Sequence, residues 1–353
     1  MLVCGIVGLP NSGKSTLFNS LLKKKIAVSA NYPFTTIEPN VGIVEVPDER
    51  LEKLKDVVEK SEGLNPNFKI IPAVVKFVDI AGLVKGAHKG EGLGNQFLSH
   101  IREVDAIVFL LRDFENADVV KTGENPKEDL EVLKSELLLK DLETVEKQQE
   151  TRDRKQETSN KFKSALEKLY EGIGREILAK DIELDSQEQQ EVKSLNLLTS
   201  KEFLIVVNSN EGDLNKEPPI NGAIRISAKL ESELADLSEG EQKEYLKELG
   251  FSEPGLNRLI NTAYKTLGLC TFFTAGPKEV HAWTIKKGTK APQAAGTIHS
   301  DFERGFIAAD VISWEELVKI GGWQKAKSGG LIKTIGKSEE VKDGMVVEFK
   351  FSV

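Results

Sequence analysis

The sequence predicts an α/β protein in which a mostly parallel sheet is interrupted by a helical insertion and followed by a second domain. Short, continuously apolar runs alternate with helical patterns in the first part of the chain, as in parallel sheets covered on both faces. Residues 112–202 contain helical patterns but no strand pattern. Near Gly268 the pattern changes to short strands separated by turns. The 353 residues leave room for two or three domains.

The first predicted strand, Leu2 to Val7, leads into a glycine-containing loop. Residues 8–16 read Gly-Leu-Pro-Asn-Ser-Gly-Lys-Ser-Thr and match the pattern G-x-x-x-x-G-K-[ST]. An amphipathic stretch, Thr16 to Leu22, follows directly. Strand, loop and helix in this order direct backbone N–H groups and a helix N-terminus at phosphate oxygens. We therefore predict a nucleotide site in which Lys14 bridges the β- and γ-phosphates and the Ser15 hydroxyl binds Mg²⁺.

Further apolar runs complete the predicted sheet. They are residues 41–46, 74–78, 106–111, 203–207 and 223–226, and a helical pattern covers residues 51–58. A nucleotide at the C-terminal end of the first strand agrees with the usual ligand position in such sheets. Cys4, in that first strand, is expected to be a small buried side chain.

A loop between the first helix and the second strand carries two adjacent threonines. It reads Tyr-Pro-Phe-Thr-Thr-Ile-Glu-Pro over residues 32–39. In nucleotide switches of this type, the first switch loop contacts the γ-phosphate and Mg²⁺. We predict that Thr36 supplies a hydroxyl ligand to Mg²⁺, with Thr35 as the alternative.

The run 74–78 ends at Asp79, where a carboxylate would hold Mg²⁺ through water. The backbone N–H of Gly82 is placed to reach the γ-phosphate. Leu83 stands where Ras-type GTPases have the glutamine that orients the attacking water, so we expect slow hydrolysis unless another group or a partner positions that water. His88, in the glycine-rich loop that follows, either acts in this way or is an ordinary exposed histidine.

Residues 207–211, Val-Asn-Ser-Asn-Glu, occupy the place where GTPases present Asn-Lys-x-Asp for base recognition. Asn208 is kept, the lysine is lost, and the aspartate is replaced by the longer Glu211. This arrangement no longer matches the N1–H and 2-amino group of guanine. Adenine has no 2-amino group, so losing the side chain that recognises this group costs adenine binding little. We therefore expect ATP as the preferred nucleotide. Ser227, in the sequence Ile-Ser-Ala-Lys, belongs to a second loop at the base edge.

The long strand-free segment carries two helical stripes. Leu130 to Val145 forms the first and Phe162 to Tyr170 the second, separated by a polar span over residues 146–161. Two such helices are expected to pack as an antiparallel arm. The arm either recognises a partner or is a solvated spacer.

The last part of the chain differs in pattern and charge. Strands are predicted at 271–273, 280–285 and 345–351, with a helical stretch around Gln293 to Ala295 and an Asp-Gly turn before the last strand. From residue 268 on, 12 basic residues face 10 acidic ones, whereas the whole chain has a net charge of −8. A slightly basic domain on an acidic body is a weak indication of RNA contact.

Composition excludes several other classes of protein. Two cysteines and four histidines give no zinc-binding spacing, and the acidic balance argues against a surface wholly devoted to nucleic acid. No apolar run approaches the length of a membrane span, and no signal-peptide pattern opens the chain. We expect a soluble, cytoplasmic protein without a membrane partner.

Taken together, these motifs resemble those of the YchF subfamily of Obg-related P-loop (TRAFAC) proteins, the Obg-like ATPases. The resemblance covers nearly the full length and is carried by five segments besides Asn-x-x-Glu at 208–211. They are Gly-Leu-Pro-Asn-x-Gly-Lys-Ser-Thr at 8–16, Pro-Phe-x-Thr-Ile at 33–37, Asp-Ile-Ala-Gly-Leu at 79–83, Gly-Glu-Gly-Leu-Gly-Asn at 90–95 and Phe-Thr-Ala-Gly-Pro-Lys-Glu-Val-His-Ala-Trp at 273–283.

This resemblance implies a P-loop NTPase G domain at 1–125 and 200–267, a helical coiled-coil insertion at 126–199, and a ubiquitin-like (β-grasp) TGS domain at 268–353. It implies hydrolysis of ATP in preference to GTP and association with ribosomes, on the large subunit or the intact particle.

The resemblance also assigns roles to residues. It implies phosphate binding by Asn11, Ser12, Gly13, Lys14, Ser15 and Thr16, Mg²⁺ binding by Ser15 and Thr36, and contact of the Ser209 main chain with adenine. In related proteins an asparagine at the position of Asn11 can help to bind a K⁺ ion that assists hydrolysis; whether it does so in this chain is open.

Two other functions stay open at this point. One is a GTPase that acts as a translation or ribosome-assembly factor. The other is a nucleotide-gated scaffold in which hydrolysis has no role.

Overall fold

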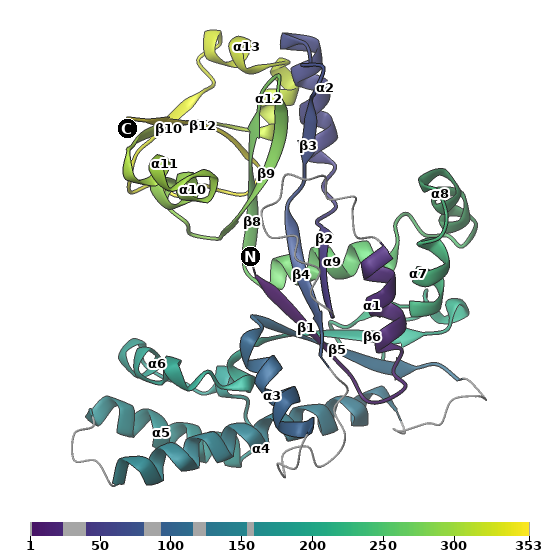
Figure 1. The fold of residues 1–353 in the computed structure, drawn as a ribbon, viewed down its shortest axis with the longest axis vertical. Helices are drawn as coiled ribbons and strands as arrows, with labels where there is room; N and C mark the ends of the chain where they lie inside the picture. Colours follow the sequence, from purple (N-terminus) through teal and green to yellow (C-terminus); the bar gives the residue numbers. More distant parts are fainter. Residues whose placement is uncertain (1, 24–39, 81–92, 116–124, 154–158, 353) are drawn as a thin grey trace. The chain divides into compact units, whose positions relative to one another are not determined.

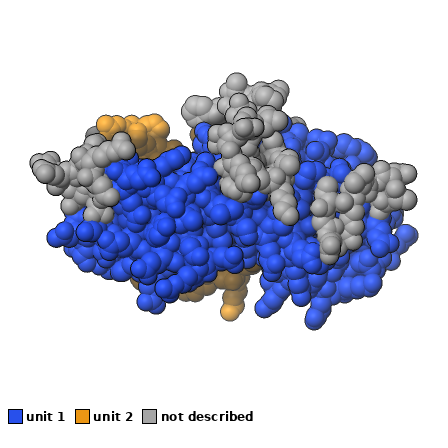
Figure 2. All heavy atoms as spheres, turned by 90° about the horizontal axis from the view of Figure 1, so that it is seen from below, with its two compact units in different colours: residues 1–44, 76–259 blue, residues 45–75, 260–353 orange. Residues whose placement is uncertain are grey.

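The computed structural model describes residues 2–23, 40–80, 93–115, 125–153 and 159–352. The chain forms two compact units, which Figure 2 shows in different colours. Unit 1 consists of residues 1–44 and 76–259, and unit 2 consists of residues 45–75 and 260–353. Each unit is built around its own six-stranded sheet.

The sheet of unit 1 has the strand order β2-β4-β1-β5-β6-β7 (Figure 1). Its strands are β1 (Val3–Val7), β2 (Val41–Glu45), β4 (Val74–Asp79), β5 (Ala106–Asp113), β6 (Glu202–Ser209) and β7 (Ile224–Ile226). From β4 to β7 every neighbouring pair is parallel. Backbone hydrogen bonds join Asp79 to Asn40 and Val46 to Ala73, so β2 runs antiparallel to β4. The predicted mostly parallel sheet is confirmed, and each strand predicted in this part of the chain is present.

The helices in this part of the chain are α1 (Lys14–Lys23), α3 (Leu93–Glu103), α4 (Pro126–Asp153), α5 (Asn160–Gly174), α6 (Ser186–Val192), α7 (Ala228–Leu234), α8 (Glu239–Glu248) and α9 (Gly255–Thr266). The sequence patterns predicted α1, α4, α5 and α9, whereas α3, α6, α7 and α8 were not predicted. Short 3₁₀ turns are η2 (Ala179–Asp181), η3 (Lys193–Leu195), η4 (Leu198–Ser200) and η5 (Glu211–Asp213). Among the described residues, no helix is both long enough and apolar enough to cross a membrane.

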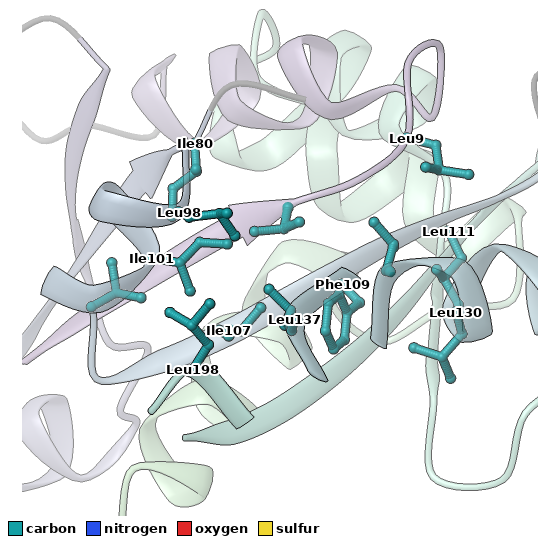
Figure 3. Packing of buried hydrophobic residues seen from close by; sticks show 13 residues of the cluster. Leu9, Ile80, Leu98, Ile101, Ile107, Phe109, Leu111, Leu130, Leu137 and Leu198 are labelled. Atoms are coloured by element: carbon teal, nitrogen blue, oxygen red, sulfur yellow. The ribbon is translucent and has the colours of Figure 1, made fainter. Parts of the chain in front are cut away.

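Helix α4 has two packing partners along its length. Its first half joins the sheet core, where Leu130 and Leu137 lie with Ile101 and Phe109 (Figure 3). Further along, Leu138 and Val145 pack in a separate cluster with residues of α5, namely Leu166, Leu169 and Ile173. The predicted packing of two amphipathic helices is therefore confirmed only for the second half of α4. The first half of the leucine stripe is buried against the sheet.

A buried carboxylate fastens α4 to the segment that returns to the sheet. Asp141 accepts hydrogen bonds from the backbone N–H of Leu198 at 2.8 Å and from the N–H and hydroxyl of Thr199, both at 2.7 Å. Burial raises the pKa of Asp141, and these hydrogen bonds oppose that effect. Leu198 and Thr199 lie in a 3₁₀ turn a few residues before β6, so this network ties α4 to the segment that enters that strand.

Unit 2 contains a mixed sheet with the order β11-β10-β12-β8-β9-β3. Its elements are α2 (Arg50–Glu62), β3 (Lys69–Ile71), β8 (Leu269–Ala275), β9 (Glu279–Lys286), α10 (Ala291–Ile298), α11 (Ser300–Arg304), β10 (Phe306–Ser313), α12 (Trp314–Ile320), α13 (Trp323–Ser328), β11 (Lys333–Ile335) and β12 (Met345–Phe351). Strand β8 is antiparallel to β9 and parallel to β12. Helix α10 shares a hydrophobic core with β8, β10 and β12, which is the β-grasp arrangement that the resemblance implied.

Residues 45–75 belong to unit 2, although they lie between two strands of the unit 1 sheet in the sequence. Strand β3 adds to β9 in parallel, pairing Ile70 with Val280. Arg50, at the start of α2, donates to both carboxylate oxygens of Asp48 and to Asp343 at 2.8 Å. Its guanidinium also lies 4.9 Å from the ring centre of Phe273. No local pattern in the sequence indicates this placement, and the three-part domain assignment stays a prediction.

Both cysteines are buried and free. Burial raises the pKa of the Cys4 thiol to about 12 and that of Cys270 to about 11, so neither is a thiolate at neutral pH. The expectation that Cys4 is a small core side chain is confirmed.

Replacing Arg50 tests how residues 45–75 are held in unit 2. The substitution Arg50→Leu leaves Asp48 without its guanidinium partner and removes the link to Asp343. We expect a loss of about 2–4 kcal/mol in the unfolding free energy of unit 2, measured by urea denaturation. Lys60→Leu, at an exposed position of the same helix, is the control and should change stability by less than about 0.5 kcal/mol. Equal effects of the two variants would contradict this role of Arg50.

The contact between α5 and α6 predicts a pH dependence. The ion pair with Lys161 and the backbone N–H of Glu188 lower the pKa of Asp185 to about 2. A lowered carboxyl pKa means that the stabilisation is complete above the ordinary value of about 4 and is lost as pH falls toward 2. Carbon-detected NMR should therefore give a titration midpoint well below 4 for Asp185. Lys161→Met should raise it, whereas Lys193→Met, an exposed control, should not. A midpoint near 4 in the unsubstituted protein would refute the assignment.

Candidate nucleotide-binding site

The loop after β1 folds as an anion-binding turn. Asn11 and Gly13 have positive φ angles of 63° and 89°, and the N–H of Ser12 donates to Leu9 at 3.2 Å. The N–H of Leu17 donates to Gly13 at 3.0 Å and is the first helical bond of α1. The N–H groups of the residues before Leu17 thus have no intrahelical acceptor, and the helix dipole favours negative charge there. This geometry suits a phosphate group.

Two glycines are required by close contacts in the loop. A Cβ atom on Gly13 would lie 2.2 Å from Nδ2 of Asn208, and the positive φ adds strain for any other residue. A Cβ atom on Gly8 would lie 2.5 Å from Oγ of Ser12. The Ser12 hydroxyl is buried and makes no hydrogen bond to any residue that the structure describes. Both glycines therefore let the loop fold tightly onto the strand ends.

Lys14 and Asp79 come together at the C-terminal edge of the sheet. The Lys14 ammonium forms an ion pair with the Asp79 carboxylate, and only 13% and 16% of their side chains are exposed. Lys14 begins α1 and Asp79 ends β4, which is the neighbour of β1 in the sheet. Ser15 and Thr16, also at the start of α1, are exposed, as is Asn11 in the loop. Two groups predicted to act on one phosphate and its metal ion are thus adjacent.

Asn208 connects two loops of the site. Its Nδ2 donates to the carbonyl of Ser12 at 2.9 Å, and its Oδ1 accepts from the N–H of Ala228 at 2.9 Å. Ser12 belongs to the phosphate loop, and Ala228 starts α7, next to Ser227. These contacts make Asn208 a positioning residue. Its predicted contact with the nucleotide stays a prediction.

The hydroxyl of Ser209 is held inside the protein. It accepts from Nη1 of Arg225 at 2.6 Å, and the same nitrogen pairs with Asp113 at 2.6 Å. Arg225 Nη2 also donates to the carbonyl of Glu217 at 3.1 Å. The Ser209 hydroxyl oxygen is thus oriented toward the Arg225 guanidinium.

Glu211 and Ser227 lie on neighbouring loops after β6 and β7. Glu211 starts η5, with 30% of its side chain exposed, and lies 3.8 Å from Nζ of Lys229. Ser227 caps α7, accepting from the N–H of Leu230 at 3.3 Å. Lys229 therefore connects the two loops predicted to face the base.

Three predicted site residues, Thr36, Gly82 and His88, lie outside the described residues, as does Leu83. Within the ranges that the structure does describe, no group of three or more carboxylate, histidine or cysteine side chains could hold a metal ion.

Sequence reasoning missed the residues that support the site. Arg225 and Asp113 fix Ser209, and Lys229 faces Glu211. Asp113 directly follows a predicted apolar strand, and Arg225 is a charged residue inside one. A buried charge in a strand requires a partner, and that signal could have identified the pair.

Two family models match the chain. Residues 3–144 match a family described as 50S ribosome-binding GTPase. Residues 269–352 match the C-terminal YchF-GTPase family, described as a protein of unknown function.

Relatives match over the full length. The ribosome-binding ATPase YchF of Bacillus subtilis is 47% identical, with 100% of both chains covered. That of Escherichia coli O157:H7 is 44% identical, with 99% of both covered. The solved structure of the Schizosaccharomyces pombe YchF GTPase has a TM-score of 0.84 at 34% identity and covers 99% of this chain and 97% of its own. Unit 1 accordingly has the P-loop GTPase fold, and the chain belongs to the YchF family.

Proposed function

We propose that this protein is a Mg²⁺-dependent ATPase that hydrolyses ATP to ADP and phosphate and binds ribosomes in a manner that depends on the bound nucleotide. The observation that carries this proposal is the Lys14–Asp79 pair beside the N-terminus of α1. A cation, a carboxylate and the N-terminus of a helix meet where a triphosphate and its metal ion would bind. The names of the bacterial relatives, ribosome-binding ATPases, support the same activity.

The phosphate site works by an exchange of partners. On nucleotide binding, Lys14 leaves Asp79 for the β- and γ-phosphates. The Asp79 carboxylate and the hydroxyls of Ser15 and Thr36 would then hold the metal ion. When bound, Mg²⁺ neutralises charge on the phosphate oxygens. Asn11, at the exposed tip of the loop, is the proposed K⁺ contact.

Hydrolysis is proposed to be slow in the isolated protein. The N–H of Gly82 contacts the γ-phosphate, and Leu83 cannot orient a water molecule. His88 or a group from a partner supplies this function. The proposed catalytic set is Lys14, Asp79 and Gly82, with His88 as the candidate within this chain for positioning the water.

The base loops support ATP as the preferred nucleotide. The Glu211 carboxylate, which lies 3.8 Å from Nζ of Lys229, is one methylene further from the backbone than the aspartate that reads guanine. The main chain of Ser209 is the proposed contact with adenine, while its hydroxyl accepts a hydrogen bond from Arg225. Asn208 and Ser227 shape the pocket around the base.

The remaining parts of the chain are proposed to bind the ribosome. The domains are the G domain at 1–125 and 200–267, the helical insertion at 126–199 and the TGS domain at 268–353. The insertion and the TGS domain dock on the large subunit or the intact particle in the cytoplasm, with an RNA contact through the TGS domain. A GTPase is the second candidate, because the Schizosaccharomyces pombe relative is titled a GTPase.

The base preference can be reversed by substitution. Titration calorimetry with Mg²⁺ should show tighter binding of ATP than of GTP. The double variant Asn210→Lys with Glu211→Asp should shift the ratio of the two Kd values toward GTP by about 10-fold or more, since it restores the guanine-reading groups. Glu233→Asp is the control, because Glu233 also lies near Lys229, at 3.7 Å. Tighter GTP binding by the unsubstituted protein would favour the GTPase.

Ribosome binding should depend on the phosphate loop. Lys14→Ala should weaken ATP binding by about 100-fold or more, because a charge-assisted contact to the phosphates is lost. Sedimentation with purified ribosomes should then show no difference between ATP and ADP. Lys23→Ala, at the other end of α1, is the matched control and should keep the difference. A nucleotide effect that survives in Lys14→Ala would exclude this site as its source.

A further inference from the structure

Unit 2 contains a cavity lined by its own residues. Its volume is about 580 Å³, within the range of ligand pockets. It lies among the turn between β8 and β9, the strand β12 and the helices α2, α10, α11 and α13. The sequence motifs assigned to nucleotide binding contribute no residue to its lining.

Aromatic rings form much of the wall of this cavity. They are Trp283, Phe302, Trp323 and Phe349. Trp283 is fixed in place, because its Nε1 donates to the hydroxyl of Thr274 at 3.0 Å and its ring stacks on His281 with 3.6 Å between ring centres. All four aromatic residues are only partly buried, which leaves ring surface for a ligand.

Carboxylates outnumber cations in the cavity lining. Glu62, Glu279 and Glu348 face a single cation, Lys278. Neither Glu62 nor Glu348 makes an ion pair with any residue in the described ranges. Glu279 lies 3.5 Å from His281, but burial lowers the pKa of this histidine, so it is neutral at physiological pH and does not compensate the carboxylate. The cavity is therefore both aromatic and negatively charged.

We propose that this cavity binds a lysine or arginine side chain of a basic, extended polypeptide segment. A cation over an indole ring and beside a carboxylate gains from both interactions. Unit 2 already uses such contacts internally, since the Lys53 ammonium lies 5.3 Å from the ring centre of Trp314. A nucleic-acid backbone does not fit the cavity, because its phosphates would meet three carboxylates. The inference depends on unit 2 alone and is independent of the proposed ATPase activity.

The test uses the full-length protein and a capped heptapeptide with three arginines. Tryptophan fluorescence should change on titration, because two of the three tryptophans line the cavity. The same peptide with citrulline in place of arginine removes the charge and should bind at least about 10-fold more weakly. Trp323→Leu should weaken arginine-peptide binding by about 5-fold or more, because it removes one of the aromatic rings on which the guanidinium would lie.

Two variants that each remove one carboxylate test whether peptide binding depends on the cavity or on the charge of the whole surface. Glu348→Gln should weaken binding by about 3-fold or more, whereas Glu315→Gln, an exposed position outside the lining, should not. Circular dichroism melts check that each variant is folded. Equal binding of the arginine and citrulline peptides, or equal effects of the two glutamate variants, would overturn the proposal. The peptide should bind Lys14→Ala as tightly as the unsubstituted protein, which distinguishes this result from failure of the nucleotide site.

Discussion

Two hydrogen bonds from the Asn208 side chain hold the candidate nucleotide site together. They connect the carbonyl of Ser12 with the N–H of Ala228, and both bonds are buried. A buried hydrogen bond of this kind is costly to lose, because each partner would be left without water or protein contact. The missing side chain of Gly13 leaves the space through which Asn208 approaches. The shape of the phosphate loop is thus imposed by β6 as well as by its own glycines.

The Lys14–Asp79 pair gives the site a definite resting arrangement. A lysine this little exposed requires an anion nearby, and the Asp79 carboxylate provides one. A phosphate group can replace that carboxylate only by competing with it. The affinity for nucleotide therefore reflects the difference in free energy between the Lys14–phosphate pair and the Lys14–Asp79 pair. The same exchange releases the Asp79 carboxylate, which we propose helps to hold the metal ion. Sequence alone assigns both residues to phosphate and metal, but it does not predict that they pair with one another.

Features with a local pattern could be predicted from the sequence. The strand Ala106–Asp113 is buried along almost its whole length and appears as a continuous apolar run, and the Asp-Gly turn predicts the start of β12 at Met345. Strand β3 has three residues, and its partner β9 lies far along the chain, so no local signal marks it. The role of Asn208 was hidden for the same reason, because both of its partners are distant in sequence. Helix α13, with six residues, is too short for a periodic pattern.

The placement of residues 45–75 changes how the two units are connected. The chain crosses between them after Val44, after Val75 and after Leu259, so three covalent links join the units where a simple two-domain chain has one. The second crossing lies within β4, the strand that ends at Asp79. Unit 2 is thereby joined through continuous β-backbone to the carboxylate that pairs with Lys14. The strand that carries Asp79 therefore belongs to both units, with Val74 and Val75 in unit 2 and Lys76 to Asp79 in unit 1.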